Sequence, residues 1–312
     1  MRTVLNTIAA VGLMAGLTAP AMAAPLDAEL MLKEYNLIVF GDITSAGTAH
    51  VEGRTFIGGN LDANQFQAGL KVSNVFPTNA NDSQFDAALV VGGDINGSGA
   101  KWFAGNAIIG GTINSSLESQ GSATGPAQTG VAIDVAAVQS AFEQMSLDLS
   151  TLDATGSLVG DTFTSTTANI DGVHVINVDA ADFAAISDLK FNVGGATTII
   201  NVGGTSFETP SSFNFNNAYQ NVIFNFFEAE MVSITKTWGA SILAPLAQVI
   251  VGPGGSLKGT VVANSVVQSM EVHAFSFDGT LPPDAVPLPA GFVLMATGLA
   301  GLAGVRSKRK RA

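Results

Sequence analysis

Two stretches near the end of the chain, SILAPLAQVIV (residues 241–251) and TVVANSVVQSM (residues 260–270), show the pattern on which the fold prediction rests. Each is a short run rich in β-branched residues, and the two align so that Ile242 corresponds to Val261. Two further phrases, FNVGGAT and INVGGTS, lie half a period apart. Four earlier phrases end their apolar runs at a glycine: LIVFGDI at Gly41, RTFIGGN at Gly58, ALVVGGDI at Gly92 and AIIGGTI at Gly110.

The steps between these four glycines follow one period. The step from Gly41 to Gly58 nearly equals that from Gly92 to Gly110, and the step between Gly58 and Gly92 is twice as long. We interpret the steps from Gly41 to Gly58 and from Gly92 to Gly110 as one coil each, and the step from Gly58 to Gly92 as two coils. Glycine and asparagine tolerate the positive φ angles that sharp corners require.

A repeat of this kind indicates stacked coils, because one coil cannot bury its apolar side alone, whereas stacked coils share a core. We therefore predict an all-β solenoid (β-helix) over residues 24–281, with coils of about 17–19 residues. A β-sandwich is the alternative, although sandwich strands seldom keep a constant period.

The period is interrupted by one predicted helix at about residues 134–152. Apolar residues recur there at spacings of three and four, which is the stripe of an amphipathic helix. Asp134 precedes the stripe and is a good N-cap. We expect this helix to lie against one flank of the solenoid; a cofactor groove or a partner helix is the less common use of such a stripe. The stripe consists of Val135, Val138, Phe142, Met145, Leu149 and Leu152.

Residues 1–23 have the features of a secretory signal peptide. Arg2 gives a short positive region, Ile8–Leu17 is an apolar run of the right length, and Ala21 and Ala23 are the small residues that signal peptidase reads. We predict cleavage before Ala24. An N-terminal membrane helix is the alternative.

The C-terminal residues form a second predicted membrane element. Residues 282–290 are a proline-rich stalk that contains the motif Val286, Pro287, Leu288, Pro289, Ala290. Residues 291–312 hold an apolar run long enough, when counted from Val286, to span a bilayer. Basic residues beside a membrane helix stay cytoplasmic, so the tail predicts a stop-transfer anchor rather than a solvated tail. The basic residues are Arg306, Lys308, Arg309, Lys310 and Arg311.

Composition excludes several classes of function. The chain of 312 residues has no cysteine, so disulfides and cysteine metal sites are absent. The whole chain has a formal net charge of −12. Between Ala24 and Ala290 there are seven basic and 25 acidic residues, so the net charge of this region is −18. Such a negative charge disfavours binding to nucleic acid. Lyases of acidic polysaccharides need clustered basic residues, which are missing. No G-x-S-x-G elbow occurs, and we predict a protein that is not an enzyme.

One loop has weak calcium-binding character. Asp94, Asn96 and Ser98 place oxygen ligands at alternate positions before Gly99, but the twelfth position of a calcium loop is Gly105 instead of glutamate. A plain turn is the favoured interpretation, and Asp42, which also follows a glycine, can cap backbone N–H groups in the same way. We predict no metal and no cofactor other than this calcium candidate.

Other polar and aromatic residues give no clear motif. His50, His174 and His273 lie too far apart for a local metal motif, and we expect single exposed histidines. Trp102 and Trp238 sit beside β phrases, so we expect core packing rather than sugar stacking. The threonine-rich stretches at residues 162–168 and 197–199 do not follow the coil period, which argues against a regular threonine ladder that binds ice.

The phrases NLIVFGDI, HVEGRTFIGGNL, ALVVGGDI, WGASILAPLAQVIVGPGGSLKGTVVANSV and FDGTLP resemble the choice-of-anchor A domain, a bacterial adhesive domain, from about Leu30 to Pro282. The VPLPAG motif, apolar run and basic cluster resemble the VPLPA type of PEP-CTERM sorting signal of Gram-negative bacteria. The first resemblance implies a right-handed β-helix at the cell surface and no agreed catalytic residues. The second implies a temporary inner-membrane anchor that an exosortase-type enzyme cuts.

Together these features predict an exported surface or biofilm-matrix protein with an adhesive or structural role, located at the cell surface, outer membrane or extracellular matrix. A glycan- or ice-binding module that uses a flat solenoid face is the alternative, and a polysaccharide-acting enzyme is the third hypothesis. Its partners would be signal peptidase, the sorting enzyme, the membrane through the C-terminal helix, and an extracellular polysaccharide or other surface ligand.

Overall fold

The computed structural model describes residues 26–283 apart from residues 46, 73–86, 211–212, 214, 216, 254–255 and 270. The predicted signal peptide, the sorting motif at 286–290 and the predicted membrane helix with its basic tail at 291–312 lie outside the described residues. Among the helices of the described residues, none has the length and apolar character needed to cross a membrane.

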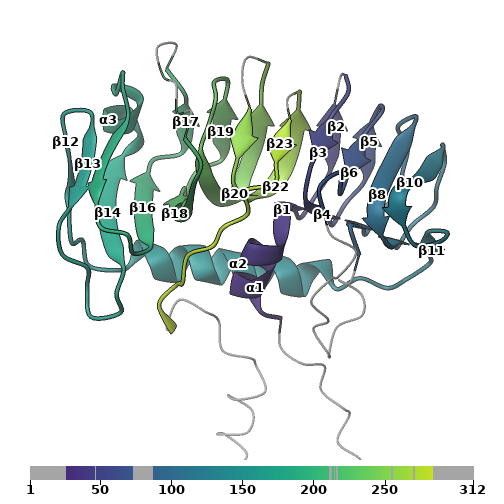
Figure 1. The fold of residues 1–312 in the computed structure, drawn as a ribbon, viewed down its shortest axis with the longest axis horizontal. Coiled ribbons are helices and arrows are strands. Elements are labelled where there is room, and N and C mark those ends of the chain that lie inside the picture. The colour runs from purple at the N-terminus through teal and green to yellow at the C-terminus, as the bar shows by residue number, and fades with distance from the viewer. Residues whose placement is uncertain are drawn as a thin grey trace, which may run out of the picture.

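The described chain is mostly β-strand, and its largest sheet has 14 strands (Figure 1). The main path runs β11-β9-β7-β4-β1-β22-β20-β18-β16-β14, and every pairing along it is parallel. The path strands are β1 (Tyr35–Val39), β4 (Arg54–Ile57), β7 (Leu89–Val91), β9 (Ala107–Ile109), β11 (Gln128–Thr129), β14 (His174–Asp179), β16 (Thr198–Gly203), β18 (Tyr219–Asn225), β20 (Ala240–Val251) and β22 (Val261–Gln268). Off the path lie β2 (Ile43–Ser45), β5 (Leu61–Ala63), β17 (Ser206–Glu208) and β19 (Met231–Ile234).

Two smaller sheets and three helices complete the described part. A six-stranded parallel sheet has the order β10-β8-β6-β3-β23-β21, with β3 (His50–Val51), β6 (Gln67–Ala68), β8 (Ala100–Gly105), β10 (Leu117–Ala123), β21 (Leu257–Lys258) and β23 (Val272–His273). A three-stranded sheet holds β12 (Ser157–Val159), β13 (Thr162–Ser165) and β15 (Lys190–Val193). The helices are α1 (Ala28–Glu34), α2 (Val135–Ser150) and α3 (Ala180–Ala184).

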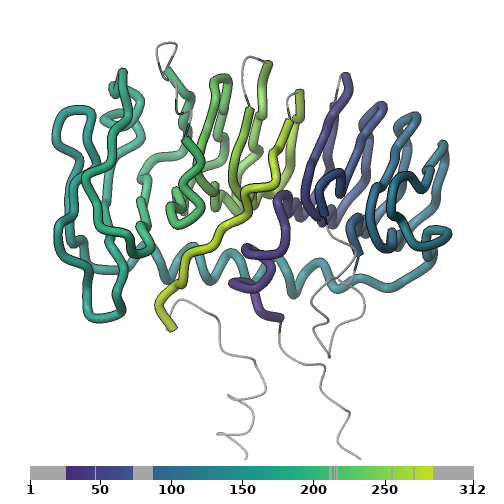
Figure 2. The backbone as a smooth tube through the Cα atoms, in the orientation of Figure 1, coloured from purple at the N-terminus to yellow at the C-terminus, as the bar shows by residue number. Residues whose placement is uncertain are grey.

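The chain does not fill the main sheet from one end to the other (Figure 2). It starts at β1 in the middle and adds neighbours outward to β11. Helix α2 then runs along the sheet, and the chain returns inward from β14 to β22. The first and last path strands therefore pair with each other, with Leu37 opposite Val261. We call the two halves the N-arm (residues 35–130) and the C-arm (residues 155–273), and their meeting place the junction.

Strand registers confirm part of the predicted repeat. Ile242 lies opposite Val261, as their alignment in the sequence predicts. The long step between Gly58 and Gly92, however, is one turn of the chain and not two, because Phe56 of β4 pairs directly with Val90 of β7. The additional residues fall between β6 and β7.

The C-arm also departs from the predicted coil length. His174 pairs with Thr198, and Thr198 pairs with Val222, so adjacent strands are 24 residues apart in sequence. The extra residues are accommodated by segments such as α3 and β15, which lie outside the main sheet.

Helix α2 confirms the predicted amphipathic helix. The Asp134 side chain accepts a hydrogen bond from the Ala137 N–H at 3.0 Å, as expected of an N-cap. Val138, Phe142, Met145 and Leu149 are fully buried against the main sheet in a core shared with α1. A second core fills the space between the sheets, where Trp102 and Trp238 are buried as predicted.

Glycines occur at the corner after the main sheet because successive turns approach each other too closely for a side chain. A Cβ atom built on Gly58 would lie 2.2 Å from the Phe40 carbonyl oxygen. On Gly92 it would lie 2.3 Å from the Gly58 oxygen, and on Gly110 it would lie 2.4 Å from the Gly92 oxygen. These contacts are with backbone atoms, which cannot rotate away. The repeated glycine of the sequence is therefore a packing requirement between turns.

We expect Gly92→Ala to lower the free energy of unfolding by about 2 kcal/mol or more, because the added methyl group overpacks a backbone contact. Urea denaturation measures the change. Gly195→Ala is the matched control, since nothing lies within 4 Å of a Cβ placed there and its φ is not positive. Equal stability of the two variants would contradict the packing argument.

Candidate functional site

One side of the stacked turns carries rows of polar side chains that run from turn to turn. This side, which we call the ladder face, is formed by β2, β5, β17, β19 and the C-terminal parts of β20 and β22. Single-residue bridges at Ile95 and Ile113 extend it through the N-arm. Adjacent strands lie ~4.8 Å apart, so equivalent side chains on successive turns form rows with that spacing.

The first row follows the corner glycines. Asp42 Oδ1 accepts a hydrogen bond from the Asn60 N–H at 2.6 Å. Asn60 Oδ1 accepts from the Asp94 N–H at 2.8 Å, and Asp94 Oδ1 accepts from the Thr112 N–H at 2.7 Å. Each side chain thus caps the backbone of the next turn, which is the turn role that the sequence offered for Asp42 and Asp94.

Two further rows lie beside the first. The Asn96 Nδ2 donates to Asp62 Oδ1 at 2.7 Å, and Asn114 Nδ2 donates to Asn96 Oδ1 at 2.8 Å. The Ser98 hydroxyl donates to Asn64 Oδ1 at 3.0 Å. The calcium-loop candidates Asp94, Asn96 and Ser98 therefore belong to three different rows, and each makes its described side-chain contacts with a neighbouring turn.

The C-arm half of the ladder face is less polar. Met231, Gln248 and Ser265 lie in one register row, and Ile250 and Val267 lie in another. Met231 is 40% exposed, and Leu246, two positions before Gln248, is 48% exposed. The ladder face therefore combines amide, carboxylate and hydroxyl groups on the N-arm with exposed apolar groups on the C-arm.

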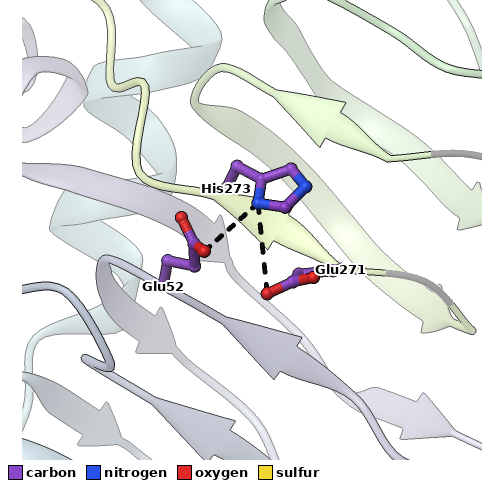
Figure 3. Close-up of side chains that lie close together, drawn as sticks. All are labelled: Glu52, Glu271 and His273. Carbon is purple, nitrogen blue, oxygen red and sulfur yellow. Dashed lines mark ion pairs between the residues drawn. The ribbon is translucent and has the colours of Figure 1, made fainter.

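Acidic and basic side chains gather at the junction, as Figure 3 shows for three of them. His273 Nδ1 lies 3.2 Å from Glu52 Oε1 and 4.0 Å from Glu271 Oε1. Lys71 Nζ lies 2.5 Å from Glu52 Oε1, and the Ala274 N–H donates to Glu52 Oε2 at 2.9 Å. Strand β23 supplies His273 from the C-arm, and Glu52 follows β3 of the N-arm, so this cluster joins the two arms.

The electrostatics of Glu52 follow from these contacts. Burial raises the pKa of its carboxyl group, but hydrogen bonds from Lys71, the Ala274 N–H and His273 outweigh burial. The pKa therefore lies below its ordinary value of 4.5. The carboxylate stays charged in the folded protein although its side chain is only 6% exposed.

The structure corrects the expectation of exposed histidines. His174 is buried, and its Nδ1 is hydrogen-bonded to the Ser165 hydroxyl at 2.8 Å. His273 is half-buried and belongs to the Glu52 cluster, which sequence spacing could not reveal because its members come from opposite ends of the domain. The two threonine-rich stretches differ in exposure: Thr197 and Thr198 are buried, whereas Thr166 and Thr167 are exposed.

A family model described as "Putative Ice-binding-like adhesive domain" matches residues 29–274. The chain belongs to this adhesive-domain family. The match confirms the adhesive-domain part of the resemblance seen in the sequence, and its bounds agree with the β-rich described region.

Comparisons with curated proteins and with solved structures give two further results. No curated protein matches the chain. The crystal structure of an ice-binding protein from an Antarctic ascomycete, Antarctomyces psychrotrophicus, aligns at 12% identity over 82% of this chain and 100% of that chain. The TM-score of this alignment is 0.31.

We expect Glu52→Gln to destabilise the adhesive domain at neutral pH by about 1 to 3 kcal/mol, because charged hydrogen bonds at the junction are lost. A lowered carboxyl pKa contributes stability above the ordinary value of 4.5, and this contribution disappears as pH falls through the lower folded pKa. The stability difference between wild type and variant should therefore persist down to about pH 4.5 and shrink as the pH falls below that value.

Thermal denaturation at neutral pH and at a series of lower pH values measures this difference. The exposed Glu118→Gln is the control, because it removes the same charge from the surface of β10. A difference between wild type and Glu52→Gln that stays constant throughout acidification would contradict the assignment.

Proposed function

We propose that the protein is a non-enzymatic surface or matrix adhesin, whose adhesive domain is a right-handed β-solenoid that binds its target through the ladder face. Membership of the adhesive-domain family is the observation that supports this most directly. The parallel strands and the turn-to-turn rows of side chains support the solenoid interpretation.

The placement of the chain ends suits such a role. The backbone N–H of Leu281 donates to Glu29 Oε1 of α1 at 3.3 Å, and the Leu281 side chain packs in the core that α1 shares with α2. In Figure 1, α1 and the end of the described chain lie on the α2 side, and β2 and β5 extend away from it. A stalk that begins at residue 282 would therefore hold the domain with the ladder face directed away from the anchor.

The proposal includes the predicted targeting elements. The signal peptide would be removed before Ala24, and the motif Val286–Ala290 would direct sorting by an exosortase-type enzyme after a temporary stay in the inner membrane. No catalytic residue is assigned, and adhesion would need no cofactor; calcium at Asp94, Asn96 and Ser98 is the weaker alternative.

Intact mass of the protein from fractionated native cells tests the sorting part of the proposal. We expect the surface or matrix fraction to hold a species that begins at Ala24 and lacks residues 291–312. If every copy keeps Arg306–Arg311 and stays in the inner membrane, the outward-facing role is wrong.

Binding of a glycan or an ice-like surface is the second candidate, favoured by the regular exposed rows at Asp62, Asn96 and Asn114. The amide and carboxylate groups of these rows have exposed atoms that hydroxyl-rich ligands could contact. Retention of the purified protein on the host polysaccharide, or its effect on growing ice, separates this candidate from a purely structural role.

We expect Thr44→Arg combined with Asn96→Arg to abolish attachment of cells or protein-coated beads to the target surface, because long charged side chains would hold a flat ligand away from the ladder face. Both positions are exposed, so the fold should tolerate them. Gln144→Arg combined with Leu147→Arg on the exposed side of α2 is the control with the same charge change. The proposed binding face is wrong if both double variants, at equal thermal stability, attach equally well.

A further inference from the structure

The junction carries a set of side chains that metal ions favour. Glu52, Glu271 and His273 each offer one ligand atom, and these atoms all lie within 4.8 Å of one another. Among the described residues, these three are the potential metal ligands that lie close enough together, as a group of at least three, to share one ion. Figure 3 shows Glu52 and Glu271 approaching the same Nδ1 of the His273 ring.

The distances are close to those of a formed site. Ligands bonded at about 2.0–2.1 Å to a tetrahedral zinc ion stand about 3.3–3.4 Å from each other. The separation of 3.2 Å between Glu52 Oε1 and His273 Nδ1 already matches this geometry. The separation of 4.0 Å between His273 Nδ1 and Glu271 Oε1 needs a small movement of Glu271, whose side chain is 39% exposed and able to adjust. One imidazole and two carboxylates are donors that a first-row transition metal accepts.

Two lysines, Lys71 and Lys258, lie near the cluster, and their positive charges oppose the binding of a metal cation to its carboxylates. Lys71 Nζ contacts Glu52 Oε1, the same oxygen that would bind a metal. The Lys71 side chain is 62% exposed, so it can turn into solvent at little cost. Lys258 lies opposite His273 in the register of β21 and β23 and adds positive charge to the surroundings. A metal ion would therefore have to displace Lys71 from Glu52, and both lysines would lower metal affinity.

The position of the cluster gives a metal ion a structural consequence. Val272 pairs with Val51, so the ligands come from the first turn of the N-arm and the last turn of the C-arm. The sequence has no cysteine, so no disulfide can link these arms. An ion that binds the folded junction and not the unfolded chain would stabilise the fold by mass action.

We propose that Glu52, Glu271 and His273 form a zinc-type divalent transition-metal site that fastens the two arms of the adhesive domain together. Water would complete the coordination shell. This site stands apart from the ladder face and does not depend on the proposed adhesive role.

The first experiment uses the full chain, purified with a chelator and then freed of it. Calorimetric titration and thermal denaturation are carried out with zinc chloride and, separately, calcium chloride. We expect zinc to bind with a stoichiometry of one and to raise the melting temperature, and calcium, which does not favour imidazole, to have little effect. No zinc-dependent shift in melting temperature, or an equal shift with calcium, overturns the proposal.

Variants then locate the ion. Glu271→Gln and His273→Gln should each weaken zinc binding by more than about tenfold, since even partners of metal ligands contribute that much. Lys71→Met should strengthen zinc binding, because it removes the competitor for Glu52. His50→Gln, a change in the neighbouring strand outside the cluster, should leave affinity unchanged. If zinc affinity is unchanged in both Glu271→Gln and His273→Gln, or if Lys71→Met does not raise zinc affinity, the bound zinc is adventitious and the proposal is wrong.

Discussion

The close approach of successive turns is the constraint on which the rest of the structure depends. At the corner after the main sheet, the backbone of one turn lies against the carbonyl oxygens of the previous turn, which leaves no room for a Cβ atom at Gly58, Gly92 or Gly110. This approach lets parallel strands pair on both sides of the corner, as β1 pairs with β4 and β2 with β5. It also brings the side chain after each corner within hydrogen-bond distance of the next turn, so the ladder face follows from the same geometry.

Because β1 and β22, the first and last strands of the main sheet along the chain, pair in the middle of that sheet, the junction must join segments that are distant in sequence. Leu37 pairs with Val261, and the Thr260 hydroxyl lies 2.7 Å from the carbonyl oxygens of Leu32 and Tyr35. Nearby, Arg54 and Glu34 form a largely buried ion pair at 2.6 Å. Such long-range contacts offset their loop-closure entropy only when both arms have formed. Helix α2 packs on strands of both arms and braces the junction from the other side.

The sequence predicts what depends on local pattern and misses what depends on three-dimensional contact. The alignment of Ile242 with Val261 and the helix capped by Asp134 follow from side-chain periodicity, and both are found in the structure. Counting glycines divided the step between Gly58 and Gly92 into two coils, because sequence distance cannot show that β4 and β7 are neighbours. The cluster around Glu52 and His273 was invisible for the same reason: its parts meet only through the junction.

The two arms use the same amide chemistry in opposite ways, and this difference distinguishes the side that α2 covers from the exposed ladder face. In the C-arm, a row of amides runs from the exposed Asn177 to the buried Asn201 and Asn225 beneath α2, with Asn225 Nδ2 donating to Asn201 Oδ1 at 2.9 Å. Asn225 Nδ2 also donates to the Ser146 carbonyl, so this row holds the helix. In the N-arm, the equivalent chain of bonds through Asn96 lies on the exposed ladder face. Buried amides direct their hydrogen-bonding groups to the fold, whereas exposed ones keep groups that a ligand can reach. The ladder face therefore combines regular spacing with accessible polar groups, and the proposed adhesive role rests on these two properties.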